Sequence, residues 1–311
     1  MDELIQAVKF SLAANFLSLG HWKESADLYS EIILTWEANG TQSEYLEESP
    51  FLLYTYMCHH LGYIRALQGR TNEAKELIQK GHTPALKQIS NLQSRAYCSL
   101  WHSSISALIG EDYGALDRVN EVLEIAEKTD SPILCYLCYA AKGNALIATE
   151  QFEMAGEIIK KALNSIEGTQ HRRFLEAVYY NLVRVSLELG DWDEADRYYQ
   201  EGLPLVELNP DREASRFNFL NGRLLASGDP PDFEKALVFF EKSILADEAS
   251  GAMVLAAQTK YYLVQMLAQK GEIERSRSLL AEIHKQFQDW NIPTWQQKCG
   301  QALENIEKGK A

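Results

Sequence analysis

The sequence predicts an all-α solenoid of about seven antiparallel helix pairs, closed by a capping helix. Three observations predict it. A short motif returns about every 40 residues, the apolar residues between its copies follow steps of three and four, and turn-forming residues are scarce. Only 18 Gly and 8 Pro occur in 311 residues, which favours long helices separated by short breaks. With 46% apolar residues to bury, we predict that residues 1–311 form a single domain.

The repeat is defined by breaks at which one apolar helical run ends and another begins. They read GHWKES, GRTNEA, GEDYGA, EQFEMA, GDWDEA, PDFEKA and GEIERS, with anchors at Gly20, Gly69, Gly110, Glu150, Gly190, Pro231 and Gly271. The anchors lie 49, 41, 40, 40, 41 and 40 residues apart, a regularity that indicates a repeat protein.

A pair of positions recurs after each anchor. The residue five positions after the anchor has a small side chain: Ser25, Ala74, Ala115, Ala155, Ala195, Ala236 and Ser276. The residue four positions after that one has a large side chain: Tyr29, Ile78, Val119, Ile159, Tyr199, Phe240 and Leu280. A step of four keeps both on one helix face, so the small residue admits a neighbouring helix and the large one fills the groove beside it. This pattern predicts helical hairpins.

Each unit therefore consists of helix A, a break and an antiparallel helix B. Helix A is placed at 3–19, 51–68, 92–109, 132–148, 172–189, 212–227 and 253–270, and helix B follows each anchor. The stretch 293–308 opens with Pro at a helix start and is polar, which predicts the capping helix. Extra residues near 37–49 predict a polar loop. A longer break before Pro231 leaves the register of the helix A at 212–227 open by about two residues.

Small residues in helix A (Gly62, Gly143 and Gly222), the GDWDEA type of break and the A-x-x-x-aromatic step in helix B together resemble the tetratricopeptide repeat. That resemblance implies a right-handed superhelical solenoid. Because the period is about 40 rather than 34, the units look like those of the C-terminal sensor region of signal-transducing ATPases, of the maltose-regulon activator type and the adenylate-cyclase-linked type. The tail FQDWNIPTWQQKCGQALENI is similar to the ending of such regions. No GxxxxGK[ST] motif is present, so the chain is either an excised sensor region or a free-standing repeat protein.

The same resemblance implies that the A helices line a concave groove, with groove positions thirteen, ten and six residues before each anchor. Transferred to this chain, they give the candidate peptide-binding residues Tyr56, His59, Tyr63, Tyr97, Asn144, Tyr180, Arg184, Gln258, Tyr261 and Gln265, beside Ser104, Leu137 and Ala140. In the unit of open register the candidates are Arg216, Phe219 and Arg223. Amides suit the main chain of an extended peptide, and aromatic faces suit its side chains. The alternative is that the tyrosines fill space between units.

The net charge of −14 repels phosphate backbones, so we expect no direct nucleic-acid binding and a preference for basic partners. The first residues carry acid where a signal peptide carries base, and the apolar run at 132–141 is too short to span a bilayer. Five cysteines without paired spacing fit a reducing compartment. We therefore expect a cytoplasmic protein without a membrane segment.

No pattern of catalytic or metal-binding residues stands out. Cys135 and Cys138 with Cys98 and His102 could close a zinc site, but cysteine packing as a small apolar residue is the favoured interpretation, and we expect no metal and no cofactor. Cys58, His59 and His60 offer a nucleophile and two bases by composition. Adjacent side chains on a helix point about 100° apart, so these residues do not form a working catalytic pair. G-x-S-x-G, H-E-x-x-H and kinase motifs are absent, so we predict that the chain is not an enzyme.

The resulting expectation is a non-enzymatic scaffold that binds a protein or peptide in its groove. By resemblance, it would be the sensor or regulatory part of a bacterial signalling or transcription-regulating protein. Two alternatives remain open. A small-molecule sensor would show a buried aromatic cluster near Tyr180. A self-assembly module would show an exposed apolar stripe on a terminal unit.

Overall fold

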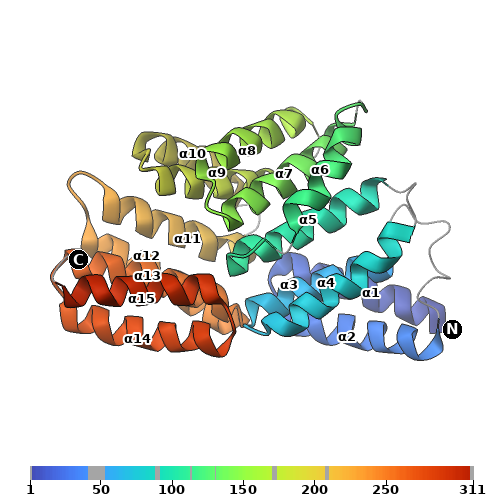
Figure 1. Ribbon diagram of the computed structural model, residues 1–311, viewed down its shortest axis with the longest axis horizontal. Coiled ribbons are helices and arrows are strands. Elements are labelled where there is room, and N and C mark those ends of the chain that lie inside the picture. The colour runs from blue at the N-terminus through green and yellow to red at the C-terminus, as the bar shows by residue number, and fades with distance from the viewer. Residues whose placement is uncertain are drawn as a thin grey trace. The chain divides into compact units, whose positions relative to one another are not determined.

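The computed structural model describes residues 2–40, 53–87, 92–112, 114–129, 131–169, 174–206 and 210–308, and within these ranges the chain forms fifteen α-helices and no strand (Figure 1). The helices are α1 (Asp2–Leu19), α2 (Trp22–Asn39), α3 (Leu53–Leu67), α4 (Thr71–Lys87), α5 (Leu92–Ile109), α6 (Ala115–Ala126), α7 (Pro132–Ala148), α8 (Phe152–Ile166), α9 (Leu175–Leu189), α10 (Trp192–Val206), α11 (Pro210–Ser227), α12 (Phe233–Ser250), α13 (Met253–Gln269), α14 (Ile273–Asp289) and α15 (Pro293–Glu307).

The predicted helix pairs are confirmed. Odd-numbered helices from α1 to α13 are the A helices, even-numbered helices are the B helices, and α15 is the capping helix. Helix ends differ from the prediction by up to three residues, as at α11, which begins at Pro210 because proline is preorganised for the first helical position. Most of the polar loop predicted near 37–49 lies outside the described residues. Within the described ranges, every helix is too short or too polar to traverse a bilayer.

The chain folds into two compact units. Unit one comprises residues 1–66 and 70–172, and unit two comprises 67–69 and 173–311. In unit one, α1 packs on α2, α5 on α4, α6 and α7, and α7 on α6 and α8. In unit two, each helix from α9 to α15 packs on the next, and α11 also packs on α9 and α13. The prediction of one single domain stays a prediction.

Six of the seven breaks share one backbone geometry. Their anchors take the left-handed conformation, with φ of 73° at Gly190 and 58° even at Glu150. The next N–H then donates to the carbonyl five residues back, as Asp191 N does to Ser186 O at 2.9 Å. At the longer break the donor is Asp232 and the acceptor Leu225 O, two residues further back than in the other units. This resolves the open register of α11 as a shift of two residues.

Small residues of the A helices face large residues of the B helices. Ala155 and Ala236 are completely buried, and Ile159 and Phe240 are nearly so. A Cβ atom at Gly143 would lie 2.4 Å from Ile159 Cγ1, and the equivalent atom at Gly222 would lie 2.9 Å from Phe240 Cδ1. The glycines thus leave space for the large side chains of the facing B helices.

Candidate binding site

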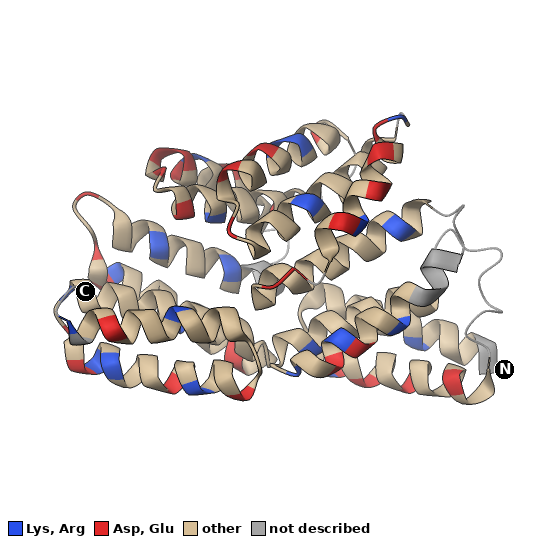
Figure 2. Cartoon of the chain, in the orientation of Figure 1, with Lys and Arg blue, Asp and Glu red and all other residues tan. Residues whose placement is uncertain are grey.

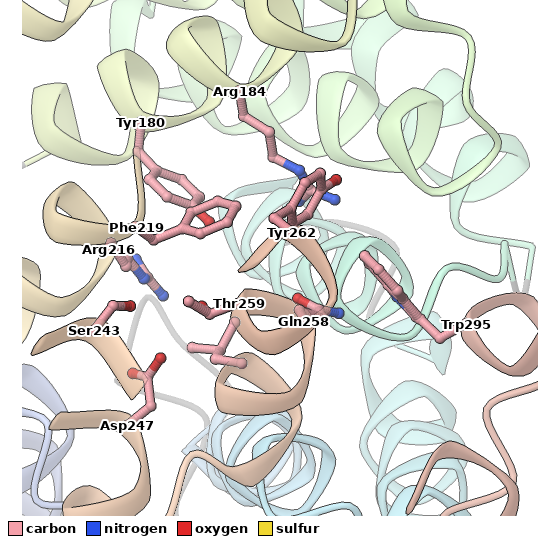
Figure 3. Close-up of a pocket in the computed structure, with 11 residues that line it drawn as sticks. Tyr180, Arg184, Arg216, Phe219, Ser243, Asp247, Gln258, Thr259, Tyr262 and Trp295 are labelled. Carbon is pink, nitrogen blue, oxygen red and sulfur yellow. The ribbon is translucent and has the colours of Figure 1, made fainter. Parts of the chain in front are cut away.

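A pocket opens between the A helices of unit two. It holds about 350 Å³ of space, part of which is open solvent. Its lining comes from α9 (Tyr180, Arg184), α11 (Arg216, Phe219), α12 (Ser243, Asp247), α13 (Leu255, Gln258, Thr259, Tyr262) and α15 (Trp295), as Figure 3 shows. Five helices therefore contribute to one cavity, and three of them are consecutive A helices.

One carboxylate ties these A helices together beside the pocket. Glu188 Oε1 accepts hydrogen bonds from Arg223 Nη1 at 2.8 Å and from the Tyr262 hydroxyl at 2.7 Å. The Arg223 guanidinium also lies 4.1 Å from the centroid of the Tyr262 ring. Burial raises the pKa of Glu188, but the Arg223 charge and the Tyr262 hydroxyl outweigh it and hold the pKa below its ordinary value. The carboxylate is consequently ionised and engaged by groups of the chain itself.

A second carboxyl, that of Asp247, lines the pocket from helix B. It is buried, and its Oδ1 accepts a 2.6 Å hydrogen bond from the Ser215 hydroxyl. Burial raises the pKa of Asp247 to about 7, against the opposing effects of the Ser215 hydrogen bond and the Arg216 charge. Asp247 thus changes charge near neutral pH.

Aromatic rings form much of the remaining wall. Phe219 meets Tyr262 edge to face with ring centroids 5.3 Å apart, and the Arg216 guanidinium lies 5.4 Å from the centroid of the Tyr180 ring. Trp295 of the capping helix contacts Tyr261 edge to face at 5.6 Å. The pocket therefore combines flat apolar surfaces with two guanidinium groups, a combination typical of ligand sites.

The candidates Tyr56 and Tyr97 meet in unit one, apart from this pocket. Tyr56 of α3 stacks on Tyr97 of α5 with ring centroids 4.5 Å apart, and their hydroxyl oxygens are 2.5 Å apart. Both side chains are half-buried. Tyr63 is buried and packs edge to face on Trp101 at 5.2 Å. The stacked pair is engaged by groups of the chain itself, so a ligand contact of Tyr56 and Tyr97 stays a prediction.

His59 is fully buried beside two further histidines. Its Nδ1 bonds the Thr55 carbonyl oxygen at 2.8 Å and its Nε2 lies 3.3 Å from His82 Nδ1, while Arg118 Nη1 lies 3.0 Å from His102 Nδ1. Burial, together with a smaller effect of the Arg118 charge, lowers the pKa values to about 4 for His59, about 2 for His82 and about 3 for His102. These neutral imidazoles belong to the core, so a ligand contact of His59 stays a prediction.

The other predicted residues are divided between the units. Asn144 is buried in unit one, where its Nδ2 donates to Ser104 Oγ at 3.1 Å. In unit two, Tyr180, Arg184 and Gln258 line the pocket together, and Gln265 is exposed and lies outside its lining. Arg216 and Phe219, which the sequence predicted as groove residues of α11, also line the pocket, in agreement with the two-residue shift of that helix.

Sequence reasoning missed Ser243, Asp247, Leu255, Thr259, Tyr262 and Trp295 as lining residues. A signal existed for Asp247. It follows Ala236, Phe240 and Ser243 at steps of four, three and four, so an acid stands on the core-facing side of helix B. Trp295 stacks on Phe287 with ring centroids 5.5 Å apart. Its second contact, with the pocket, depends on how the last three helices pack.

The cysteines Cys98 and Cys138 are buried, and the Cys135 thiol donates to the Ala126 carbonyl oxygen at 3.4 Å. Burial raises the pKa of Cys138 to about 12, so it is a thiol rather than a thiolate at neutral pH. Over the part of the chain that the structure describes, no three His, Cys, Asp or Glu side chains are grouped so that they could hold a metal ion.

Comparison with known proteins supports the tetratricopeptide-like fold. A family model described as "Tetratricopeptide repeat" matches residues 178–213, which cover most of α9, all of α10 and the start of α11. A Rap protein crystallised in complex with competence and sporulation factor has a TM-score of 0.56 at 15% identity, covering 99% of this chain and 98% of that one. The apo form of RapI scores 0.51 at 14% identity, covering 82% and 98%. Aspartyl phosphate phosphatase F from Bacillus subtilis scores 0.51 at 13% identity, covering 98% and 95%. No curated protein matches the sequence. The chain is therefore a tetratricopeptide-like helical repeat protein.

Proposed function

We propose that the chain is a non-enzymatic scaffold that binds a peptide or protein segment through its A helices, with the pocket of unit two as the principal contact. The observation that carries this proposal is the pocket itself, where side chains from three consecutive A helices converge. Binding at the inner helices is how repeat proteins of this architecture use their surface. The half-buried stacked pair Tyr56 and Tyr97 supports a second contact in unit one.

The proposed role is that of a sensor or regulatory part of a cytoplasmic bacterial signalling protein. The period of about 40 residues, typical of the sensor regions of signal-transducing ATPases, supports it. Further support is that a Rap protein of the same fold was crystallised with competence and sporulation factor.

A pull-down from lysate of the source organism tests the scaffold, with captured proteins identified by mass spectrometry. Tyr180→Ala with Arg184→Glu alters two lining residues, and Arg277→Glu makes the same change of charge at a half-exposed position of α14 outside the pocket lining. We expect a partner that the wild type and Arg277→Glu capture and the pocket variant loses. Equal capture by all three, or none, would exclude the pocket as a protein-binding site.

A small-molecule sensor is a second candidate, favoured by the aromatic walls around Tyr180. Tyr180, Phe219, Tyr262 and Trp295 surround one cavity, which is the feature expected of a small effector site. Native mass spectrometry of the full chain, incubated with the low-mass fraction of the lysate, tests this. An adduct that is lost in Phe219→Ala would support it, and an unmodified mass spectrum would contradict it.

Self-association is supported by an apolar stripe on α1. Leu4, Val8 and Leu12 stand four residues apart and are 71%, 58% and 42% exposed. Sedimentation should show an oligomer that Leu4→Glu with Val8→Glu converts to a monomer. A wild-type monomer at all concentrations would rule this out.

A further inference from the structure

Two tryptophans, Trp22 and Trp192, occupy the same position of the repeat, two residues after an anchor, but they differ in exposure. Trp22 is 6% exposed and meets Tyr63 of the next A helix edge to face, with ring centroids 6.2 Å apart. Trp192, the first residue of α10, is 41% exposed and makes no ring contact with any described residue. A large flat side chain is therefore left open at the start of α10.

The cause lies in the A helix that follows, α11. Tyr63 stands six residues before its anchor, and with the two-residue shift of α11 the corresponding residue is Arg223. The Arg223 guanidinium bonds Glu188 at 2.8 Å and lies 4.1 Å from the centroid of the Tyr262 ring. Arg223 is therefore held by two groups of the A helices, and no aromatic ring covers Trp192 as Tyr63 covers Trp22.

A second apolar side chain is exposed at the same break. Leu189, the last residue of α9, is 43% exposed, and only Gly190 and Asp191 stand between it and Trp192. Tryptophan is among the residues that contribute most to protein interfaces, and apolar groups that gather on a surface mark contact sites. The break between α9 and α10 thus has the apolar part of a docking surface.

Carboxylates flank the exposed indole. Asp193 and Asp196 are exposed and lie three residues apart, and Asp196 follows Trp192 by one helical turn, so the three side chains are neighbours. Neither carboxylate has an ion-pair partner among the described residues, and Asp196 accepts only a 3.2 Å hydrogen bond from Gln200 Nε2. Arg197, the one basic residue of α10, pairs with two other glutamates. Figure 2 shows the acidic residues along α10.

The charge of this surface determines which partner fits it. Nucleic acids and anionic membranes have the same sign as Asp193 and Asp196 and are repelled. A second copy docked symmetrically would place the same carboxylates against each other. A basic protein segment is attracted. Arginine fits better than lysine, because its planar guanidinium can lie on the Trp192 indole and donate to carboxylates at the same time.

We propose that Leu189, Trp192, Asp193 and Asp196 form a docking surface for a basic segment of a partner protein, here called the Trp192 surface. An arginine of the partner lies on the Trp192 indole and bonds the two carboxylates, and an apolar residue beside that arginine contacts Leu189. None of these four residues lines the pocket, so this partner is additional to the ligand proposed there.

The test uses the full chain and three immobilised pools of acetylated and amidated peptides. In the first pool arginine stands on both sides of an apolar residue. In the second each arginine is replaced by lysine, and in the third by citrulline, its neutral isostere. Biolayer interferometry should show the arginine pool bound about two- to fivefold more tightly than the lysine pool, and the citrulline pool bound least. High salt should weaken the binding. Equal binding of the arginine and citrulline pools would overturn the proposal.

Variants assign the binding to the Trp192 surface. Trp192→Leu keeps an apolar side chain and should abolish the preference for arginine over lysine. Asp193→Asn with Asp196→Asn should weaken the binding of both basic pools by about threefold or more. Glu153→Gln with Glu157→Gln is the matched control, because it removes two exposed carboxylates from α8, one of them also three residues after an anchor. It should change nothing.

Equal weakening by the α10 and α8 pairs of substitutions would contradict a local site. The pocket variant Tyr180→Ala with Arg184→Glu should bind the arginine pool at least as tightly as the wild type, and loss of binding in that variant would place the basic segment in the pocket instead. A wild-type dimer in sedimentation that Trp192→Leu converts to a monomer would identify a second copy as the occupant and overturn the proposal. Circular dichroism checks the fold of each variant, and if Trp192→Leu is unfolded, the two pairs of acid substitutions decide.

Discussion

Tyr262 donates a 2.7 Å hydrogen bond to Glu188, a residue 74 positions earlier in the chain. The contact joins α13 to α9, and Arg223 of α11 bonds the same carboxylate oxygen. Three consecutive A helices thus meet at one ionised group. Because each bond to a charged acceptor is stronger than a neutral one, this junction fixes the helices that carry the pocket.

Arg223→Met should destabilise the protein, because it leaves the Glu188 carboxylate poorly solvated and without its charged partner. The expected loss in free energy of unfolding is about 2 kcal/mol or more. Urea unfolding followed by circular dichroism measures it. Adding Glu188→Gln should restore part of the loss, since no unpaired charge remains. If the double variant loses more free energy of unfolding than the losses of the two single variants added together, Arg223 and Glu188 are not coupled in this way.

Gly143→Ala should destabilise unit one, because the new Cβ would lie 2.4 Å from Ile159 Cγ1. The expected cost is about 1–3 kcal/mol. Gly300→Ala is the matched control, since no atom lies within 4 Å of a Cβ added at this helical position. It should be neutral or stabilising by up to about 1 kcal/mol, because alanine favours helix. Similar effects at both positions would refute the close approach of α7 and α8.

Glu150→Gly should stabilise the protein. Glu150 has a φ of 58°, which costs a residue with a side chain about 1 kcal/mol and costs glycine little. The reverse change at an equivalent break, Gly190→Ala at φ 73°, should lower the midpoint of thermal unfolding. Calorimetry on both variants measures whether the midpoint of thermal unfolding rises for Glu150→Gly and falls for Gly190→Ala. A lower midpoint for Glu150→Gly would show that contacts of the glutamate stabilise the protein more than its backbone conformation destabilises it.

Stability should fall as the pH drops below about 6.5. His59, His82 and His102 are buried and have folded pKa values of about 4, 2 and 3, whereas an unfolded histidine titrates near its ordinary value. The unfolded state then binds more protons, so the stabilisation is complete above pH 6.5 and is lost progressively toward pH 4 and below. The expected loss is about 1 kcal/mol per histidine between pH 6.5 and 5.5.

Urea midpoints measured from pH 7.5 to 5 check this slope. His82→Leu removes one of the buried imidazoles and should reduce the pH dependence, whatever its effect on stability at pH 7.5. His21→Gln, at an exposed position before α2, is the control and should leave the slope unchanged. A slope that is the same in all three proteins would mean that the buried histidines do not cause it.

The helix pairs could be predicted because their signals are local. The anchor, the small residue five positions later and the large residue four beyond it lie within ten residues, so the hairpin is encoded in each unit by itself. The same local geometry places Tyr180 and Arg184 on one face of α9, and both line the pocket. The register of α11 could not be read from the sequence, because two extra residues in the break that follows α11 do not change the helical periodicity.

Only the tertiary structure decided which groove candidates are accessible. His59 and Tyr97 are both groove positions in the pattern, ten and thirteen residues before their anchors, yet the first is buried against His82 and the second is half-buried beside Tyr56. Asp247 and Trp295 join the pocket through the packing of helices distant in sequence. The sequence by itself determined the repeated helical hairpin, since its information lies within one unit. The pocket and its charge balance depend on distances between units, which periodicity does not specify.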